Sequence, residues 1–273
     1  MDWSKTQTIF IIVFLILNMF LYSLYIDRKN AAQDLDIIAD KSLEVRLKED
    51  RITMEELPEI EDGNLYISGK RHKFTLSEVA DMPGQNFYVE DTGYTLTGTL
   101  NQPQTLKKID AESLTEFVED YVYLGDQFTL WEIDEDEQRA IFFQKTSDRP
   151  IYYEEDAVLE IEWNKDNLIR MYKLSMLTEM EPFEHQAPLV EPVAVIEKLY
   201  LQKLLEPKDH IKSVNIGYTF MSALSQREVF VATWEVHVEN KELQTEESFF
   251  VNAVDGTILN ITPSERVDDE RKE

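Results

Sequence analysis

An uncharged, strongly apolar run near the start of the chain constrains its fold more than any other feature. The run covers Ile9–Ile26, reads IFIIVFLILNMFLYSLYI, and stops abruptly at Asp27, Arg28 and Lys29. As a helix it would extend roughly 27 Å, close to the thickness of about 30 Å of a bilayer's hydrocarbon core. The sequence therefore predicts a transmembrane anchor at residues 9–26, preceded by a short cytoplasmic N-terminus at residues 1–8.

The run is typical of an uncleaved anchor rather than a secretory signal peptide. A signal peptide needs a basic leading segment, a shorter apolar core and small residues before the cleavage site. Here Asp2 offsets Lys5, and Leu21–Tyr25 contains no A-x-A pattern. An unusually long signal peptide stays open as the alternative. We expect a single-pass protein of the cell membrane, with its N-terminus in the cytoplasm and its C-terminal domain outside the cell.

Asn18 lies near the middle of the apolar run. A side-chain amide in hydrocarbon seeks a hydrogen-bond partner and can hold transmembrane helices together. The alternative is a bond to the backbone of its own helix. We predict that Phe14, Asn18 and Tyr22 contact a partner within the membrane.

The rest of the chain is strongly acidic and contains no cysteine. The whole sequence has 27 basic and 54 acidic side chains, with a net charge of −27. Because such a surface repels nucleic-acid phosphates, we expect no nucleic-acid binding. The absence of cysteine is typical of bacterial cell-surface proteins, and it excludes thiolate metal sites and cysteine nucleophiles.

A first helix-plus-strand pattern follows the anchor. Residues 27–60 read as a juxtamembrane helical segment, and Pro58 is expected to end its helix. In the first exported unit, residues 61–181, Asp110 is expected to cap a helix that ends just before Gly125. Strands are expected at residues 65–68, 87–89, 128–133, 139–144, 157–163 and 168–176, with turns at Gly84, Gly93, Gly98 and Asn164–Asn167.

A second unit, residues 182–263, repeats this order after a proline-rich linker at residues 181–191. Pro192 suits the first turn of a helix, which is expected to run to Pro207 with the apolar stripe Val193, Ile196, Tyr200 and Leu204. Strands are expected at residues 211–221, 228–239, 245–253 and 257–261, with Asp255-Gly256 as a type I′ turn. The prediction is an α+β protein with one transmembrane helix, two similar units of a helix and an antiparallel meander, and a disordered charged tail at residues 264–273.

No motif predicts catalysis, a metal site or a cofactor. The histidines His72, His185, His210 and His237 are scattered without metal-ligand spacing, and His237 is expected on the solvent side of its strand. The acidic runs at residues 134–137 and 154–156 lack the pattern of an EF-hand and read as solvated loops. Paired carboxylates of a glycosidase stay open, because their separation cannot be read from a sequence. We expect a protein that is not an enzyme.

Specific sequence features resemble one known family. The start Asp2-Trp3-Ser4-Lys5, the core Leu17–Leu21, the charged stop and the later Ala253–Ile258 resemble the YycI (WalI) family. That family is encoded beside the WalK/WalR (YycG/YycF) two-component system of low-GC Gram-positive bacteria, which controls cell-wall metabolism. The resemblance implies a non-enzymatic regulator that associates with the sensor histidine kinase WalK and with YycH, through transmembrane and exported contacts. It also implies an exported fold that resembles part of YycH.

Two other functions stay open. A module that senses wall precursors would need a pocket in the exported domain. A membrane-tethered wall hydrolase would need a cleft with converging carboxylates or a histidine-centred site.

Overall fold

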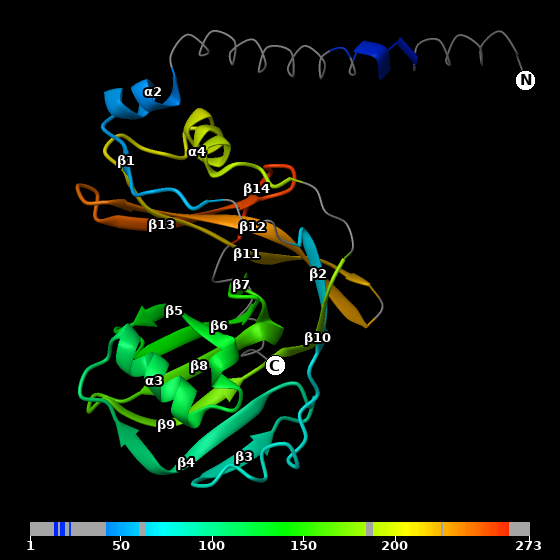
Figure 1. The fold of residues 1–273 in the computed structure, drawn as a ribbon, viewed down its shortest axis with the longest axis vertical. Helices are drawn as coiled ribbons and strands as arrows, with labels where there is room; N and C mark the ends of the chain where they lie inside the picture. The colour runs from blue at the N-terminus through cyan, green and yellow to red at the C-terminus, as the bar shows by residue number, and fades with distance from the viewer. Residues whose placement is uncertain are drawn as a thin grey trace, which may run out of the picture. The chain divides into compact units, whose positions relative to one another are not determined.

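The computed structural model describes residues 14–15, 17–19, 22, 42–59, 64–183, 188–224 and 226–261. They belong to two compact units, residues 1–53 and 54–273. The fold is mixed α+β, with a large sheet and few helices (Figure 1). Most of the predicted anchor, His185 and the predicted tail lie outside the described residues. Within the described ranges, no helix is long and apolar enough to cross a membrane.

Among its described residues, the first unit contains helix α2 (Leu43–Glu49). The amides of Asp50 and Arg51 donate to carbonyl groups of its last turn. Arg51 then takes a positive φ of 59°, and a left-handed residue at this position ends a helix. The prediction that Pro58 ends this helix was therefore wrong. Strand β1 (Thr53–Met54) stands at the boundary of the two units.

In the described residues of the second unit there are two helices, two short 3₁₀ turns and the strands β2 to β14. Its helical elements are α3 (Ala111–Tyr121), η1 (Gly125–Gln127), η2 (Glu155–Ala157) and α4 (Pro192–Leu201). Its strands are β2 (Tyr66–Arg71), β3 (Gln85–Val89), β4 (Leu96–Thr105), β5 (Phe128–Asp134), β6 (Arg139–Thr146), β7 (Arg149–Tyr152), β8 (Val158–Trp163), β9 (Leu168–Leu174), β10 (Leu177–Pro182), β11 (His210–Leu224), β12 (Arg227–Asn240), β13 (Thr245–Asn252) and β14 (Ile258–Leu259).

One half of the sheet has the antiparallel order β5-β6-β8-β9-β4-β3, with α3 on one face (Figure 1). The buried side of α3, with Leu114, Phe117 and Val118, packs into the apolar core of this half. Asp110 caps the helix as predicted, since the amide of Ser113 donates to its Oδ1 at 3.0 Å.

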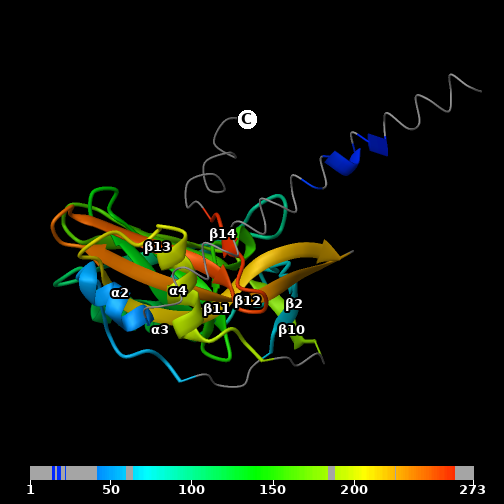
Figure 2. The ribbon, with the colours of Figure 1, turned by 90° about the horizontal axis from the view of Figure 1, so that it is seen from above.

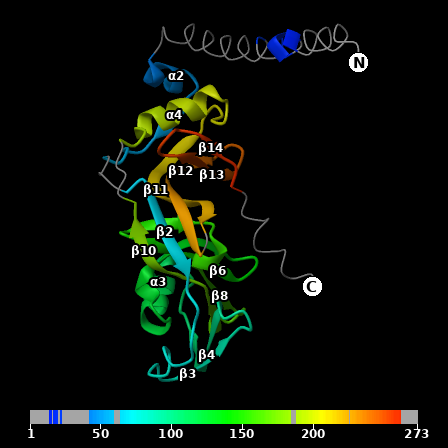
Figure 3. The ribbon, with the colours of Figure 1, turned by 90° about the vertical axis from the view of Figure 1, so that its right-hand side faces the viewer.

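The other half is built around the long strand β12. One edge of β12 pairs with β11, and the other pairs first with β2 and then with β13. Helix α4 contacts β12 (Figure 2), and the indole Nε1 of Trp234 donates to the carbonyl of Val190 at 2.8 Å. Strand β10 extends this half beyond β2 (Figure 3).

The short strand β7 joins the two halves. It pairs in parallel with β11 and continues from β6 through a tight antiparallel turn. Strands β2 and β7 precede residue 182 in the sequence, yet they pair with β12 and β11, which follow it. The predicted division of the exported part at residues 181 and 182 stays a prediction.

Several local predictions were wrong. Gly98 lies inside β4 rather than at a turn, and the ring of Tyr172 occupies the space that a Cβ there would need. Helix α4 ends at Leu201, and Val193 is 49% exposed, because Val195, Ile196 and Leu199 form the buried side.

The turn before β14 also differs from its prediction. Gly256 has a φ of +71°, but Asp255 is not among the residues with positive φ, as a type I′ turn would require. Instead, Asp255 Oδ1 accepts from the amide of Thr257 at 2.8 Å, and Asn252 bonds across the loop to Thr257 and Gly256.

Candidate functional site

A groove of about 1520 Å³ lies between the two halves of the sheet. One wall is formed by residues 129–133 of β5, by the turn that precedes β7 and by β7 itself. The opposite wall is formed by β11, β12 and β13. Its volume exceeds the usual range of about 300–1,000 Å³ for a small-molecule pocket. The groove is an open concavity in the region that the ligand-sensing hypothesis concerns, and ligand binding stays a prediction.

Aromatic rings form part of the groove surface. Trp131 packs edge-on against Tyr153 at a centroid distance of 5.6 Å, and both Tyr152 and Tyr153 contact Phe250 of the opposite wall. The indole Nε1 of Trp131 donates to the hydroxyl of Tyr153 at 3.1 Å. Trp131 is the extra residue where the register of β5 shifts between Leu130 and Glu132, and such bulges redirect a side chain at the edge of a sheet.

The wall opposite Trp131 contains a buried carboxylate, Glu235, whose side chain is 2% exposed. The hydroxyl of Ser248 donates to its Oε1 at 2.6 Å, and the amide of Asn215 donates to its Oε2 at 3.0 Å. Among the described basic side chains, only His237 approaches it to ion-pair distance, at 3.9 Å. Glu235 is thus held mainly by neutral donors, so its negative charge is only partly compensated.

The hydrogen bonds fix the role of His237 and Ser248. The hydroxyl of Ser248 donates its hydrogen bond to Glu235, so the Ser248 oxygen accepts a hydrogen bond from Nδ1 of His237, at 3.0 Å. His237 is therefore a donor toward Ser248 and not a base that could activate it, as a serine nucleophile would require. His237 lies on the predicted face of its strand, opposite Trp234, but that face lines the groove and the side chain is 29% exposed.

The groove disfavours added negative charge. Burial raises the pKa of Tyr153 to about 12, and the nearby carboxylates of Glu132 and Glu235 raise it too, against a lowering by the bond from Trp131. Burial, followed by the charge of Glu235, also raises the pKa of Tyr152 well above its ordinary value. Both tyrosines therefore stay neutral at physiological pH.

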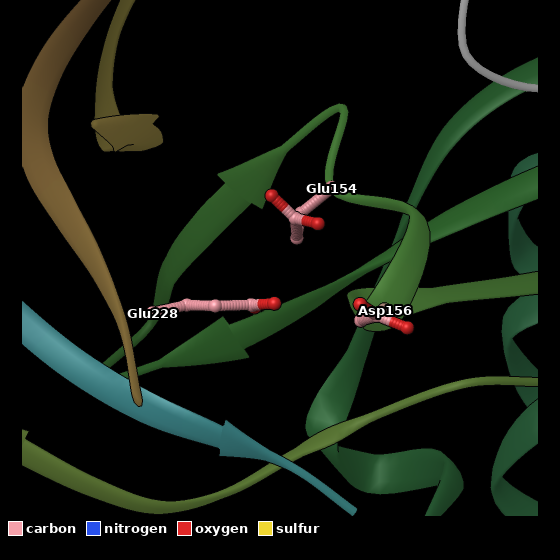
Figure 4. Close-up of side chains that lie close together, drawn as sticks. All are labelled: Glu154, Asp156 and Glu228. Atoms are coloured by element: carbon pink, nitrogen blue, oxygen red, sulfur yellow. The ribbon is translucent and has the colours of Figure 1, made fainter. Parts of the chain in front are cut away.

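A second cluster lies where the loop after β7 meets the start of β12 (Figure 4). Carboxylate oxygens of Glu154, Asp156 and Glu228 lie within 4.8 Å of one another. Arg71 Nε lies 2.5 Å from Asp156 Oδ2. Burial, and then the charge of Asp156, raise the pKa of Glu228 to about 6. The prediction of a solvated loop was wrong for Glu154, which is 8% exposed.

The other sites predicted from sequence have simple surroundings. The loop at residues 134–137 is solvated as expected, with Asp134 Oδ1 accepting from the amides of Asp136 and Glu137. His72 lies 2.9 Å from a carboxylate oxygen of Glu78. His210 lies 3.4 Å from one of Glu55, far along the chain.

The three residues predicted to contact a partner in the membrane are described. Phe14 is 65% and Tyr22 64% exposed. The amide Nδ2 of Asn18 donates to the carbonyl of Phe14 at 2.8 Å, which is the backbone bond considered as the alternative. Contact of Phe14, Asn18 and Tyr22 with a partner stays a prediction.

Residues 32–254 match the family model described as YycI protein. The chain belongs to the YycI family. The N-terminal part of the resemblance lies outside this match, whereas Ala253 and Val254 lie inside it. The YycI family is a regulatory family, and membership supports a role for this chain in the WalK (YycG) two-component system.

No curated protein matches the sequence. Two solved structures are similar to this chain at low sequence identity. An uncharacterized protein from Eubacterium rectale is 9% identical, with a TM-score of 0.44 over 78% of this chain and 92% of that chain. The C-terminal domain of YpeB from Bacillus megaterium is 11% identical, with a TM-score of 0.39 over 67% of this chain and 90% of that chain.

Proposed function

We propose that this chain is a single-pass membrane protein that modulates the activity of the sensor kinase WalK, acting together with YycH. The observation that supports this proposal most strongly is the YycI family match over residues 32–254. The apolar run at residues 9–26 supports the membrane location. In this proposal the N-terminus lies in the cytoplasm and the acidic domain lies outside the cell.

The proposed mechanism is a shift between two states of the kinase. A bound protein changes such an equilibrium only by its difference in affinity for the two states, and about 1.4 kcal/mol changes the ratio tenfold. One N–H of the Asn18 amide donates to Phe14, and an amide offers a second N–H and an oxygen. A hydrogen bond from Asn18 to a kinase helix would supply about 0.6–2 kcal/mol, with Phe14 and Tyr22 packing beside it.

The direct test measures autophosphorylation of WalK in proteoliposomes with and without the full chain, and with and without YycH. We expect the rate to change when the chain is present, and to change further with YycH. An identical rate in all four samples would contradict the proposal.

A substitution tests the membrane contact separately. Asn18→Leu removes the amide and keeps an apolar side chain of similar size, so we expect a several-fold weaker signal with WalK or YycH in a membrane two-hybrid assay. Met19→Leu, at the neighbouring position, is the matched control and should leave the signal unchanged. Equal signals for both variants would show that Asn18 does not contribute to assembly.

The other functions left open by the sequence have weaker support. The carboxylates that converge, Glu154, Asp156 and Glu228, do not line the groove, and Ser248 is bonded to Glu235 rather than to a base. The groove itself suits ligand sensing, but its acidic lining repels a phosphate-bearing wall precursor. Kinase regulation is therefore the single function that we propose.

A further inference from the structure

The ionisable residues of the groove are predominantly acidic. Its basic members are Arg149 and His237. Its acidic members are Glu59, Glu132, Asp148, Glu235, Glu246 and Glu247. This excess selects for a positively charged occupant, because a concave surface with one sign of charge concentrates the opposite charge.

Part of this negative charge is not neutralised by the protein itself. Lys212 lies 3.1 Å from Glu246, and Lys145 lies 3.6 Å from Asp148. Across the described residues, neither Glu132 nor Glu247 has a lysine, arginine or histidine within ion-pair distance, and both side chains are exposed. They lie on β5 and β13 respectively, and both line the groove.

Glu235 adds a charge beneath the groove surface. The side chain of Glu235 is 2% exposed, so it attracts a cation in the groove at a distance rather than by direct contact. The attraction is strong there because buried charges are less screened by water and salt than exposed ones.

The shape of the groove favours an extended chain over a compact ion. The acidic residues come from several different elements on both walls, so one small cation would meet few of them. Within the described part of the chain, β5 pairs with β6 alone. Its open edge offers backbone donors and acceptors that an extended peptide can use. The half-buried ring of Trp131 provides a face for a cationic side chain.

We propose that this groove is the docking site for an extended, basic segment of a partner protein. Lysine or arginine side chains of the segment pair with Glu132 and Glu247, and one of them lies over Trp131. The main chain of the segment follows β5. This proposal stands independently of whether the chain regulates WalK.

The test uses the full chain in nanodiscs of zwitterionic lipid, so that basic peptides find no anionic membrane. A random dodecapeptide phage library is selected on this sample, and enriched peptides are synthesised for titration by tryptophan fluorescence. We expect enriched peptides to carry several lysine or arginine residues. Glu132→Lys and Glu247→Lys should each weaken their binding about tenfold, which corresponds to about 1.4 kcal/mol.

Glu116→Lys, on the exposed side of α3, is the matched control. It changes the net charge by the same amount outside the groove, so its effect on affinity should stay below about twofold. Trp131→Phe, which keeps an aromatic ring, should remove most of the fluorescence response while leaving the binding of peptides measurable by calorimetry.

Several results would overturn the proposal. One is an equal loss of affinity in all three lysine variants, which would indicate attraction to the overall acidic surface. A second is the absence of basic residues among enriched peptides. A third is binding of spermidine as tight as that of the peptides, which would indicate a small-cation site. A fourth is self-association of the chain that Glu132→Lys abolishes, which would make a second copy the occupant.

Discussion

Two carboxylates in this molecule, the buried Glu235 and the half-buried Glu228, have different surroundings. Glu235 receives hydrogen bonds from Ser248 and Asn215. The Oε2 atom of Glu228 is buried without a hydrogen-bond partner within the described residues. Its pKa is raised to about 6, first by burial and then by the charge of Asp156. At neutral pH Glu228 therefore opposes folding, whereas Glu235 shapes the groove.

The first prediction concerns the stability of Glu228→Gln. A carboxyl group whose pKa is raised by folding contributes its stability below the unfolded pKa of 4.5, and loses it as the pH rises through about 6. The amide stays neutral at every pH. We therefore expect the variant to exceed the native protein in free energy of unfolding by about 1 kcal/mol at pH 8, after allowance for partial solvent exposure. At pH 5, which lies between the two pKa values, the difference should be less than half as large.

Urea denaturation at both pH values measures this difference. Glu116→Gln, on the exposed side of α3, is the control for a change in net charge and should change little at either pH. A gain for Glu228→Gln that is the same at pH 5 and pH 8 would contradict the assignment of the raised pKa.

For single residues, the sequence correctly predicted the features that depend on residues nearby in the chain. The cap at Asp110 and the turn at Asn164 depend on neighbours within four residues, and the structure confirms both. The surroundings of Glu154 and Glu235 depend on strands far away in the sequence. An acidic residue next to other acidic residues looks like a solvated one, because the sequence does not show which segment will cover it.

Among the elements, β12 and β7 determine where the groove lies. The middle of β12 is buried on both faces. Helix α4 contacts this strand, and its residues Glu235 and His237 line the groove. β7 is only four residues long, so the two halves of the sheet are held together over a short distance. The groove lies beside this junction, with residues of β5 and β11 among its lining.

The second prediction concerns Gly217 in β11. A Cβ at this position would overlap the ring of Tyr152 and the carbonyl oxygen of Pro150, and a backbone atom cannot rotate away as a side chain can. Gly217→Ala should therefore separate β7 from β11 and lower the free energy of unfolding by about 1–3 kcal/mol. We also expect faster hydrogen exchange at the amides of Ile151 and Thr219.

Gly69→Ala in β2 is the matched control. Its added Cβ meets chiefly the sulfur of Met180, and a flexible thioether side chain can move aside. The control should be less destabilising and should leave exchange in β7 unchanged. If Gly217→Ala exchanges like the native protein at Ile151, the packing of Tyr152 on β11 is not what holds the two halves together.

The predicted strands β5, β6, β8, β11 and β12 are confirmed, and clean alternation indicated β8 and β12. Strands β4, β7 and β10 were missed. β4 contains Gly98 and Pro103, β7 contains Pro150, and β10 ends at Pro182. Such residues normally interrupt strands, and here the pairing of distant strands overrides the local preference. The groove was not predictable because β7 is what brings its two walls together.

For the molecule as a whole, charge separates two regions of sequence. Residues 1–29 contain three basic and two acidic side chains, so the acidic excess of the chain lies entirely beyond them. An acidic surface with a docking groove suits contacts with soluble segments of other proteins. A nearly neutral, apolar segment suits contacts between helices in a membrane. In the proposed regulator these two contacts are separable.

The third prediction tests that separation. A fragment of residues 1–30, expressed in a membrane together with WalK, should co-purify with the kinase and alter its phosphorylation output, because the proposed helix contacts lie wholly within it. The same fragment with Asn18→Leu should be recovered in several-fold lower yield. A fragment that neither co-purifies nor changes the output would place the regulatory contact in residues 31–273. In that case Glu132→Lys in the full chain becomes the variant that should change WalK output.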